Sequence, residues 1–171
     1  NQGKVIGGVS SVNGVCANRG LPSDFADWEK RGATGWGWED VLPYYKKLEN
    51  DHDFDGPLHG KEGPIGLRRL FEDRWPGFTA SAIKAAADQG WEDLRDQNGD
   101  FRDGYFPIPM NNINDRRVGV STAYLTHEVR ARPNFDLQDG THVHHLLFDG
   151  TRCIGARTER GGEITDIHAR E

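Results

Sequence analysis

Apolar residues recur at helical spacing in two parts of the first two thirds of the chain, and capping residues mark a further helix before them. Ser23 or Asp24 can cap a short helix that ends near Arg31. Residues 38–48 predict a second helix, which tolerates its proline if that residue lies in the first turn. Residues 75–90 predict a third, amphipathic helix that ends at a glycine. Its apolar stripe consists of Phe78, Ala82, Ala85 and Ala86.

Beyond Pro133 the pattern changes to short alternating runs that are typical of β-strands. Glycine-containing turns separate these runs, which predicts an antiparallel meander. We therefore assign the chain to the α+β class, with a helix- and loop-rich first half followed by a small antiparallel β-meander. The minor predicted elements are a short strand at residues 63–68 and a short helix that opens at residues 121–125 and ends near Arg132-Pro133. The strands predicted for the meander cover residues 134–139, 142–148, 152–158 and 163–169.

Residues 3–20 fit neither pattern. Glycines and serines alternate there with small apolar residues, and a flexible linker does not need those valines. A strand would not tolerate both Gly7-Gly8 and Asn13-Gly14. We expect a buried loop whose backbone runs close to a ligand, because glycine has no Cβ and free backbone amides can bind a polar or anionic group.

Composition narrows the class of protein. The 171 residues have a mean hydropathy of -0.75 and a net charge of -6. Basic residues are scattered, so a nucleic-acid partner is not expected. No apolar run reaches the ~20 residues of a membrane helix, and no signal peptide is visible. Cys16 and Cys153 are expected to be buried free thiols, which indicates a reducing, cytoplasmic location.

Two patterns suggest metal ligands, and we favour a simpler interpretation of both. Asp51 and Glu62 bound a sequence that fits a calcium-binding EF-hand loop, but Gly63-Pro64 cannot begin the exiting helix. We expect an acidic surface turn there instead. His142 and His144 share one strand face without a third ligand, so we expect exposed histidines and no metal site.

Motifs spread along nearly the whole chain together resemble those of one family. The resemblance is carried by Gly3-Lys-Val-Ile-Gly-Gly-Val-Ser-Ser-Val-Asn-Gly, Arg19-Gly20, Asp24, Trp28, Gly35-Trp36-Gly37-Trp38, residues 41–47, Gly63-Pro64, Asn98-Gly99, residues 121–125 and 132–134. The chain is similar in these motifs to the glucose–methanol–choline (GMC) family of FAD-dependent oxidoreductases, in particular to its choline-dehydrogenase-like branch.

The resemblance implies which residues contact the cofactor. The signature loop of this family lies along the flavin and the pyrophosphate of FAD, and Asn13-Gly14 would be nearest the flavin ring. Val143 matches a valine whose backbone contacts the adenine. The implied cofactor-binding residues are Val5, Gly7, Gly8, Asn13, Gly14, Val15, Cys16 and Val143.

Three positions depart from the family pattern. Val9 stands where glycine, serine or cysteine is usual, so the loop has to accommodate a β-branched side chain. Gly119 stands where serine is common. Val12 occupies the position of a histidine that some members bond covalently to FAD, and therefore the resemblance implies non-covalent FAD here.

By the same resemblance, the chain is a central piece of a two-domain flavoprotein that oxidises a small-molecule alcohol. Neither the dinucleotide-binding G-x-G-x-x-G motif nor the catalytic histidine of the family is in the sequence, and none of its seven histidines is assigned as the catalytic base. The alternative is a non-catalytic module that binds no FAD by itself, and a calcium-binding module is a third hypothesis. The expected division is an FAD-contacting loop and helix (1–32), a flavin lid with the start of the substrate-binding region (33–133) and the β-meander of the FAD domain (134–171).

Overall fold

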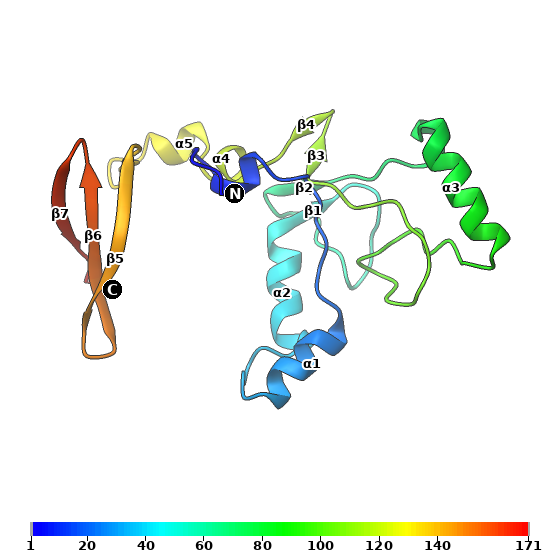
Figure 1. The fold of residues 1–171 in the computed structure, drawn as a ribbon, viewed down its shortest axis with the longest axis horizontal. Coiled ribbons are helices and arrows are strands. Elements are labelled where there is room, and N and C mark those ends of the chain that lie inside the picture. The colour runs from blue at the N-terminus through cyan, green and yellow to red at the C-terminus, as the bar shows by residue number, and fades with distance from the viewer. Residues whose placement is uncertain (1, 171) are drawn as a thin grey trace. The chain divides into compact units, whose positions relative to one another are not determined.

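Helices, very short strands and long loops make up the first of two units in the computed structural model, which describes residues 2–170 (Figure 1). This unit runs to Thr126, and the second begins at His127. The three main helices expected from the sequence are present as α1, α2 and α3. The elements of the first unit are η1 (Gly8–Ser11), α1 (Pro22–Lys30), α2 (Trp38–Leu48), β1 (Glu49–Asp51), β2 (Ile65–Leu67), η2 (Glu72–Arg74), α3 (Gly77–Asp88), β3 (Asn112–Ile113), β4 (Arg116–Arg117) and α4 (Val120–Ala123).

Local details of these helices differ from expectation. Neither predicted residue is the N-cap of α1. Instead, Asp24 lies inside the first turn, where its Oδ2 accepts a hydrogen bond from the Leu21 amide at 2.8 Å. Pro43 lies in the second turn of α2, where the missing amide leaves a carbonyl of the preceding turn without its helical donor.

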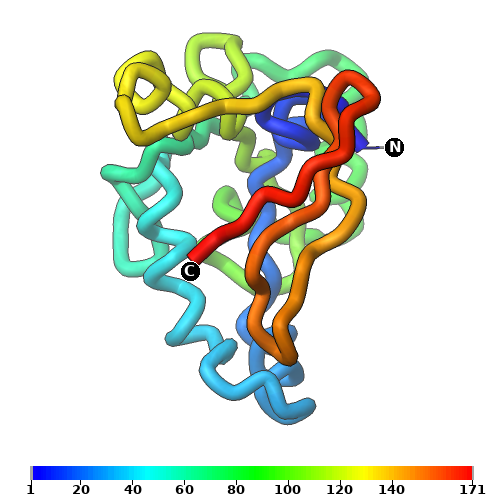
Figure 2. The backbone as a smooth tube through the Cα atoms, turned by 90° about the vertical axis from the view of Figure 1, so that its left-hand side faces the viewer, coloured from blue at the N-terminus to red at the C-terminus, as the bar shows by residue number. Residues whose placement is uncertain are grey.

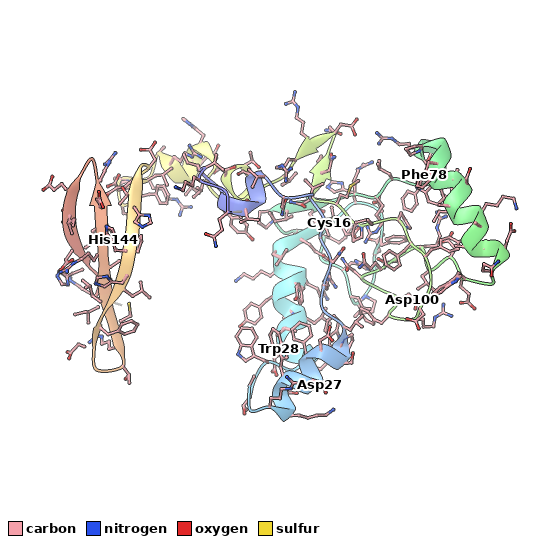
Figure 3. The ribbon with its side chains drawn as sticks, viewed as in Figure 1. Cys16, Asp27, Trp28, Phe78, Asp100 and His144 are labelled. Atoms are coloured by element: carbon pink, nitrogen blue, oxygen red, sulfur yellow. The ribbon has the colours of Figure 1, made fainter. Side chains whose placement is uncertain are left out.

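The predicted apolar stripe of α3 does not become a buried face. Phe78 is 87% exposed, and its side chain is labelled on α3 in Figure 3. The remaining stripe residues are alanines, which offer little apolar area to drive burial.

Charged and polar side chains, more than apolar ones, fill the interior of the first unit. The apolar side chains buried there include Phe25, Leu67, Leu94 and Pro109. Strand β1 pairs in parallel with β2, and the buried polar groups lie around this pair. They are Glu49, Asp51, His59, Arg69, Asn98 and Asn111.

Arg69 is the centre of this charged core. Its Nη1 atom lies 2.9 Å from both carboxylate oxygens of Asp51, and its Nη2 atom lies 3.0 Å from Asp96 Oδ1. The side chains of Arg69 and Asp51 are fully buried. The acidic surface turn expected at residues 51–62 is therefore wrong at its first residue, because Asp51 pairs with an arginine that lies 18 positions later in the chain.

His59 joins three carboxylates in the same core. Its Nε2 atom lies 2.7 Å from Asp96 Oδ2, and its Nδ1 atom lies 3.2 Å from Asp51 Oδ2 and 3.6 Å from Glu49 Oε1. Burial by itself would lower the pKa of His59, but the contacts with Asp51, Asp96 and Glu49 raise it to about 10. For the carboxylate of Asp51 the effect of burial has the opposite sign and would raise the pKa. The contacts with His59, the Asp53 amide and Arg69 nevertheless hold the pKa of Asp51 well below its usual range.

A three-stranded antiparallel meander forms the second unit after helix α5 (His127–Arg130). Its strands are β5 (Thr141–Asp149), β6 (Arg152–Arg160) and β7 (Glu163–His168), in the order β5-β6-β7 (Figure 2). Three of the four predicted strands are thus confirmed. The fourth, at residues 134–139, is wrong, since this segment is irregular and pairs with no strand among residues 2–170.

Two further findings concern the chain as a whole. Cys16 and Cys153 are free, as expected, but both are exposed, so the prediction of buried thiols is wrong. Among residues 2–170, no helix combines the length and apolar character that crossing a membrane requires.

Replacing Asp51 by asparagine should destabilise the first unit by roughly 3–5 kcal/mol, because the change leaves Arg69 and His59 buried without a full countercharge. Urea unfolding measures this free energy. Asp103→Asn, at an exposed residue, is the control and should change it by less than about 0.5 kcal/mol. Equal stability of both variants would contradict the central role of the network.

The contribution of His59 to stability should depend on pH in one direction. Its pKa in the folded chain is about 10 against 6.5 for a free histidine, so its contribution is complete below pH 6.5 and is lost as the pH rises to about 10. The difference in free energy of unfolding between wild type and His59→Gln should therefore shrink over this range. A His59 difference that stays constant to pH 10.5 would refute the assignment.

Candidate functional site

The glycine-rich loop of residues 3–20 lies on the surface of the first unit. Val5, Val9 and Val12 are 52%, 51% and 59% exposed. The expectation of a buried loop is therefore wrong for the chain as the structure describes it, residues 2–170. Val9 lies in the short helix η1, where the loop accommodates its β-branched side chain half exposed. The loop presents a row of apolar side chains to the outside.

Glycines of the loop have two different roles. Gly7 has a φ of 91°, and a Cβ there would lie 2.5 Å from Ser11 Oγ and 3.1 Å from Ser121 Cβ. Gly7 thus lets the loop fold tightly onto the start of α4. At Gly14, by contrast, a Cβ would approach only Cys16 Sγ, at 3.9 Å, and at Gly8 it would meet nothing within 4 Å. Backbone near Gly14 is therefore open to a ligand.

Backbone amides along the open part of the loop are free to donate. Within residues 2–170, no group accepts a hydrogen bond from the amides of Gly7, Gly14 or Cys16. Nearby amides are used differently, since Asn13 N donates to Val9 O at 2.9 Å. Three unpaired donors on a glycine-rich loop suit the carbonyl and phosphate oxygens of a cofactor.

Val15 adds backbone strain at the same place. Its φ is 59°, in the left-handed region where a β-branched residue is an outlier. Two hydrogen bonds hold it there: its amide donates to Asn13 Oδ1 at 3.1 Å, and its carbonyl accepts from Asn111 N at 2.9 Å. Strain of this kind persists only where surrounding structure imposes it, and it is concentrated at functional sites.

The end of the loop is fastened to the charged core. Arg19 Nη2 lies 2.5 Å from Glu49 Oε1, and Arg19 Nη1 donates to Leu58 O at 2.6 Å. Asn98 Oδ1 accepts from Arg19 N at 3.3 Å, while its Nδ2 donates to Ala17 O at 3.0 Å. The sequence indicated Asn98 only as part of a motif, and its role as an anchor is visible only in the structure.

The predicted site residues do not all belong to one unit. Those from Val5 to Cys16 lie in the first unit, with Cys16 labelled in Figure 3. Val143 lies on β5 in the second unit and is 52% exposed. Sequence reasoning missed Arg117, whose guanidinium contacts the middle of the loop from β4.

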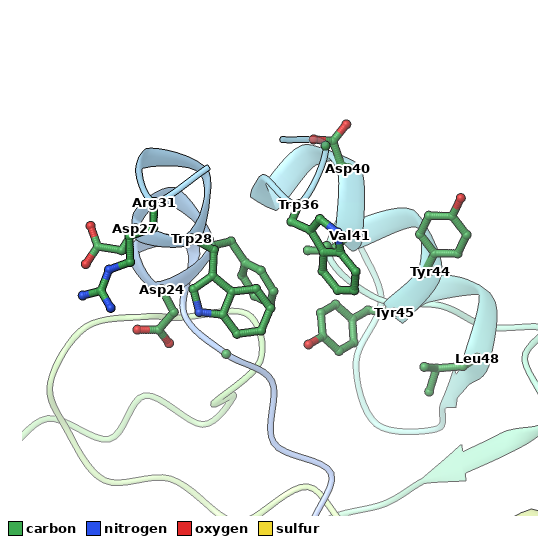
Figure 4. Close-up of a pocket in the computed structure, with 13 residues that line it drawn as sticks. Asp24, Asp27, Trp28, Arg31, Trp36, Asp40, Val41, Tyr44, Tyr45 and Leu48 are labelled. Atoms are coloured by element: carbon green, nitrogen blue, oxygen red, sulfur yellow. The ribbon is translucent and has the colours of Figure 1, made fainter. Parts of the chain in front are cut away.

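An aromatic hollow of about 1030 Å³ lies between α1 and α2 (Figure 4). The Trp28 and Trp36 rings are 5.9 Å apart, and Tyr44 is 69% exposed at its rim. Asp24 and Asp27 add carboxylates on the α1 side. Sequence reasoning predicted no hollow here, because its lining combines residues of two helices and of the loop between them.

Three buried groups of the core have the residue types of a metal site. Donor atoms of Glu49, Asp51 and His59 lie within 4.8 Å of one another. However, arginine guanidinium groups already pair with both carboxylates, and a metal cation would have to displace them. Calcium binding by residues 51–62 would meet the same obstacle at Asp51. We therefore interpret Glu49, Asp51 and His59 as part of a structural ion-pair network.

The strand histidines are exposed, as predicted. The rings of His142 and His144 lie 4.9 Å apart on β5, which confirms that they share a face. His144 Nε2 lies 2.9 Å from Glu159 Oε2 on the neighbouring strand, and Figure 3 labels it on the meander. A carboxylate partner across the strands accounts for this histidine without a metal.

Comparisons with known proteins agree on one family. Residues 1–171 match the GMC oxidoreductase family. The chain is 43% identical over 171 residues to 5-(hydroxymethyl)furfural oxidase of Methylovorus sp. (strain MP688), covering 99% of the chain and 32% of that protein. It is 36% identical over 169 residues to oxygen-dependent choline dehydrogenase of Brucella anthropi, covering 99% of the chain and 30% of that protein.

A solved structure has the same fold. Pyridoxine 4-oxidase from Mesorbium loti superposes with a TM-score of 0.88 at 28% identity, covering 98% of the chain and 33% of that protein. The α+β assignment is thereby confirmed. The chain spans about a third of the length of these relatives.

Alanine at Gly7 and at Gly14 should separate the two glycine roles. Gly7→Ala should destabilise the first unit by about 1–2 kcal/mol, because it places a Cβ at positive φ and against Ser121. Gly14→Ala should leave the melting temperature within about 1 °C of wild type, since its Cβ has room. Thermal unfolding of both variants measures the difference, and equal losses would show that the loop is not open at Gly14.

Proposed function

The chain belongs to the GMC oxidoreductase family, and from that premise we propose that it forms the flavin-facing part of an FAD-dependent oxidoreductase acting on the CH–OH group of small alcohols. One observation carries the proposal: the open loop at Gly14, with unpaired amides and a strained Val15, lies where the family signature implies the cofactor. Because the chain spans about a third of its relatives, the activity is that of a longer protein.

The residues of the loop fit FAD in kind. Amides of Gly7, Gly14 and Cys16 are donors for the polar edge of the flavin and for phosphate oxygens. The exposed valines offer an apolar surface for the ring system. Val12 has no nucleophilic nitrogen, and this supports a cofactor that is held without a covalent bond.

FAD supplies the hydride acceptor for alcohol oxidation when it is bound. The residues of this chain orient and hold it, while none of the seven histidines is proposed as the base that takes the hydroxyl proton. Hydroxymethylfurfural, choline and pyridoxine, named for three relatives, all carry a CH₂OH group, which supports a small primary alcohol as the substrate.

We also propose a role for each of three segments of the chain. Residues 1–32 would supply the FAD-contacting loop and helix, residues 33–133 the flavin lid with part of the substrate wall, and residues 134–171 the meander with Val143 at the adenine. The exposed thiols of Cys16 and Cys153 are free, and this supports a reducing, cytoplasmic environment.

A second candidate is a module that binds no FAD by itself. The observation that favours it is that the predicted cofactor residues fall in two units, the loop in the first and Val143 in the second. Binding of FAD would then require further protein.

Titration of the purified chain with FAD should distinguish these candidates. We expect the fluorescence of FAD to change in a saturable manner, and Gly14→Ala should weaken binding by about tenfold, since a methyl group would obstruct the open backbone. Gly77→Ala is the control, because its Cβ also meets nothing within 4 Å but lies on α3. No saturable signal from a folded wild-type chain would favour the second candidate, and equal affinities of the two variants would remove Gly14 from the site.

A further inference from the structure

One arginine holds the middle of the loop from a distant part of the sequence. Arg117 Nη1 donates to Asn13 Oδ1 at 2.6 Å, and Arg117 Nη2 donates to Asn13 O at 2.6 Å. Its Nη1 atom also donates to Ser10 O at 3.2 Å. The guanidinium therefore fixes the main chain and the side chain of Asn13 together, which a single-point contact could not do.

These contacts continue to the strained residue. Asn13 Oδ1 accepts both from Arg117 and from the amide of Val15. Val15 keeps its left-handed φ of 59° partly through that bond. Gly14 lies between the two residues, so the direction of its unpaired amide depends on how both neighbours are held.

Ion pairing does not explain the position of Arg117. Its side chain is half-buried, and all of its hydrogen-bond acceptors among residues 2–170 are neutral oxygens. No carboxylate of these residues lies within 4.0 Å of it, whereas Arg69 pairs with three. The charge of Arg117 therefore remains uncompensated within the described chain and adds a positive potential beside Asn13.

A second segment supports the same loop beside Arg117. Ser10 Oγ accepts from the Val120 amide at 3.0 Å at the start of α4. Gly119, where the family commonly has serine, allows this approach, because a Cβ there would lie 3.1 Å from Ser10 O. The segment from β4 to α4 thus serves as a scaffold for a loop that lies more than 100 residues earlier.

We propose that Arg117 is the positioning residue of the cofactor loop: it sets the conformation of Asn13, Gly14 and Val15, and so aims the unpaired amides at the bound group. That the group is FAD rests on the proposed function. The effect on the loop itself rests only on contacts within this chain.

Hydrogen exchange of the full 171-residue chain without FAD tests the effect on the loop. In Arg117→Met, the amides of Asn13 and Val15 should exchange at least about tenfold faster, because charge-assisted hydrogen bonds of this kind contribute about that factor or more. Arg117→Lys should restore part of the protection, since an ammonium can reach one oxygen but cannot bind as a fork. Arg116→Met is the matched control and should change nothing, because this exposed neighbour has no hydrogen bond or ion pair of its side chain among residues 2–170.

FAD titration of the same variants tests the consequence for the ligand. Arg117→Met should weaken FAD binding by about tenfold, and its effect should be clearly smaller when Asn13 is already alanine, because the two residues act as one unit. A general loss of folding would instead give equal effects in both backgrounds.

The possible failures are distinguishable. Unchanged exchange at Asn13 and Val15 in Arg117→Met would overturn the positioning role whether or not FAD binds. Another outcome is that the amides exchange faster in Arg117→Met while the wild-type chain binds no FAD. This result would uphold Arg117 as the residue that orders the loop, and it would count against the proposed function of this chain alone. Equal FAD affinity of wild type and Arg117→Met would overturn the link to the cofactor.

Discussion

The pairing of Arg69 with Asp51 and Asp96 is the interaction on which the first unit depends. A buried arginine costs several kcal/mol unless carboxylates surround it, so the surrounding chain has to bring them to fixed positions. Asp51 comes from β1, Arg69 follows β2, and Asp96 lies in a later turn. Few apolar side chains are buried in this unit, and the ion pairs determine how its short elements are arranged.

The candidate site gains its order from this core without being buried in it. Arg19 and Asn98 fasten one end of the loop to the charged interior, and Arg117 holds its middle. With these supports, Gly14 and Cys16 can keep unpaired amides and Val15 can keep an unfavourable φ. A loop that is held from behind and open in front has the properties of a prearranged binding surface.

The first unit exposes apolar side chains on its surface, while its interior contains charged ones. Val5, Val9 and Val12 face outward along the loop, and aromatic rings line the hollow between α1 and α2. Apolar groups gathered at the surface mark places where a ligand or another protein segment binds. The loop valines coincide with the family signature, which is why the cofactor is proposed there and not in the hollow.

The sequence by itself determined the helices, three of the strands and the family, because apolar spacing, glycine turns and signature residues are local patterns. It also indicated Gly7 and Gly14 as special positions, since glycine has no Cβ and lets the backbone approach another group closely. Only the tertiary structure decided that Gly7 serves the fold while Gly14 stays open, that Asp51 is buried, and that Arg117 binds Asn13. These outcomes depend on pairs of residues far apart in the chain, and nothing in a local pattern specifies which distant charge or carbonyl will be the partner.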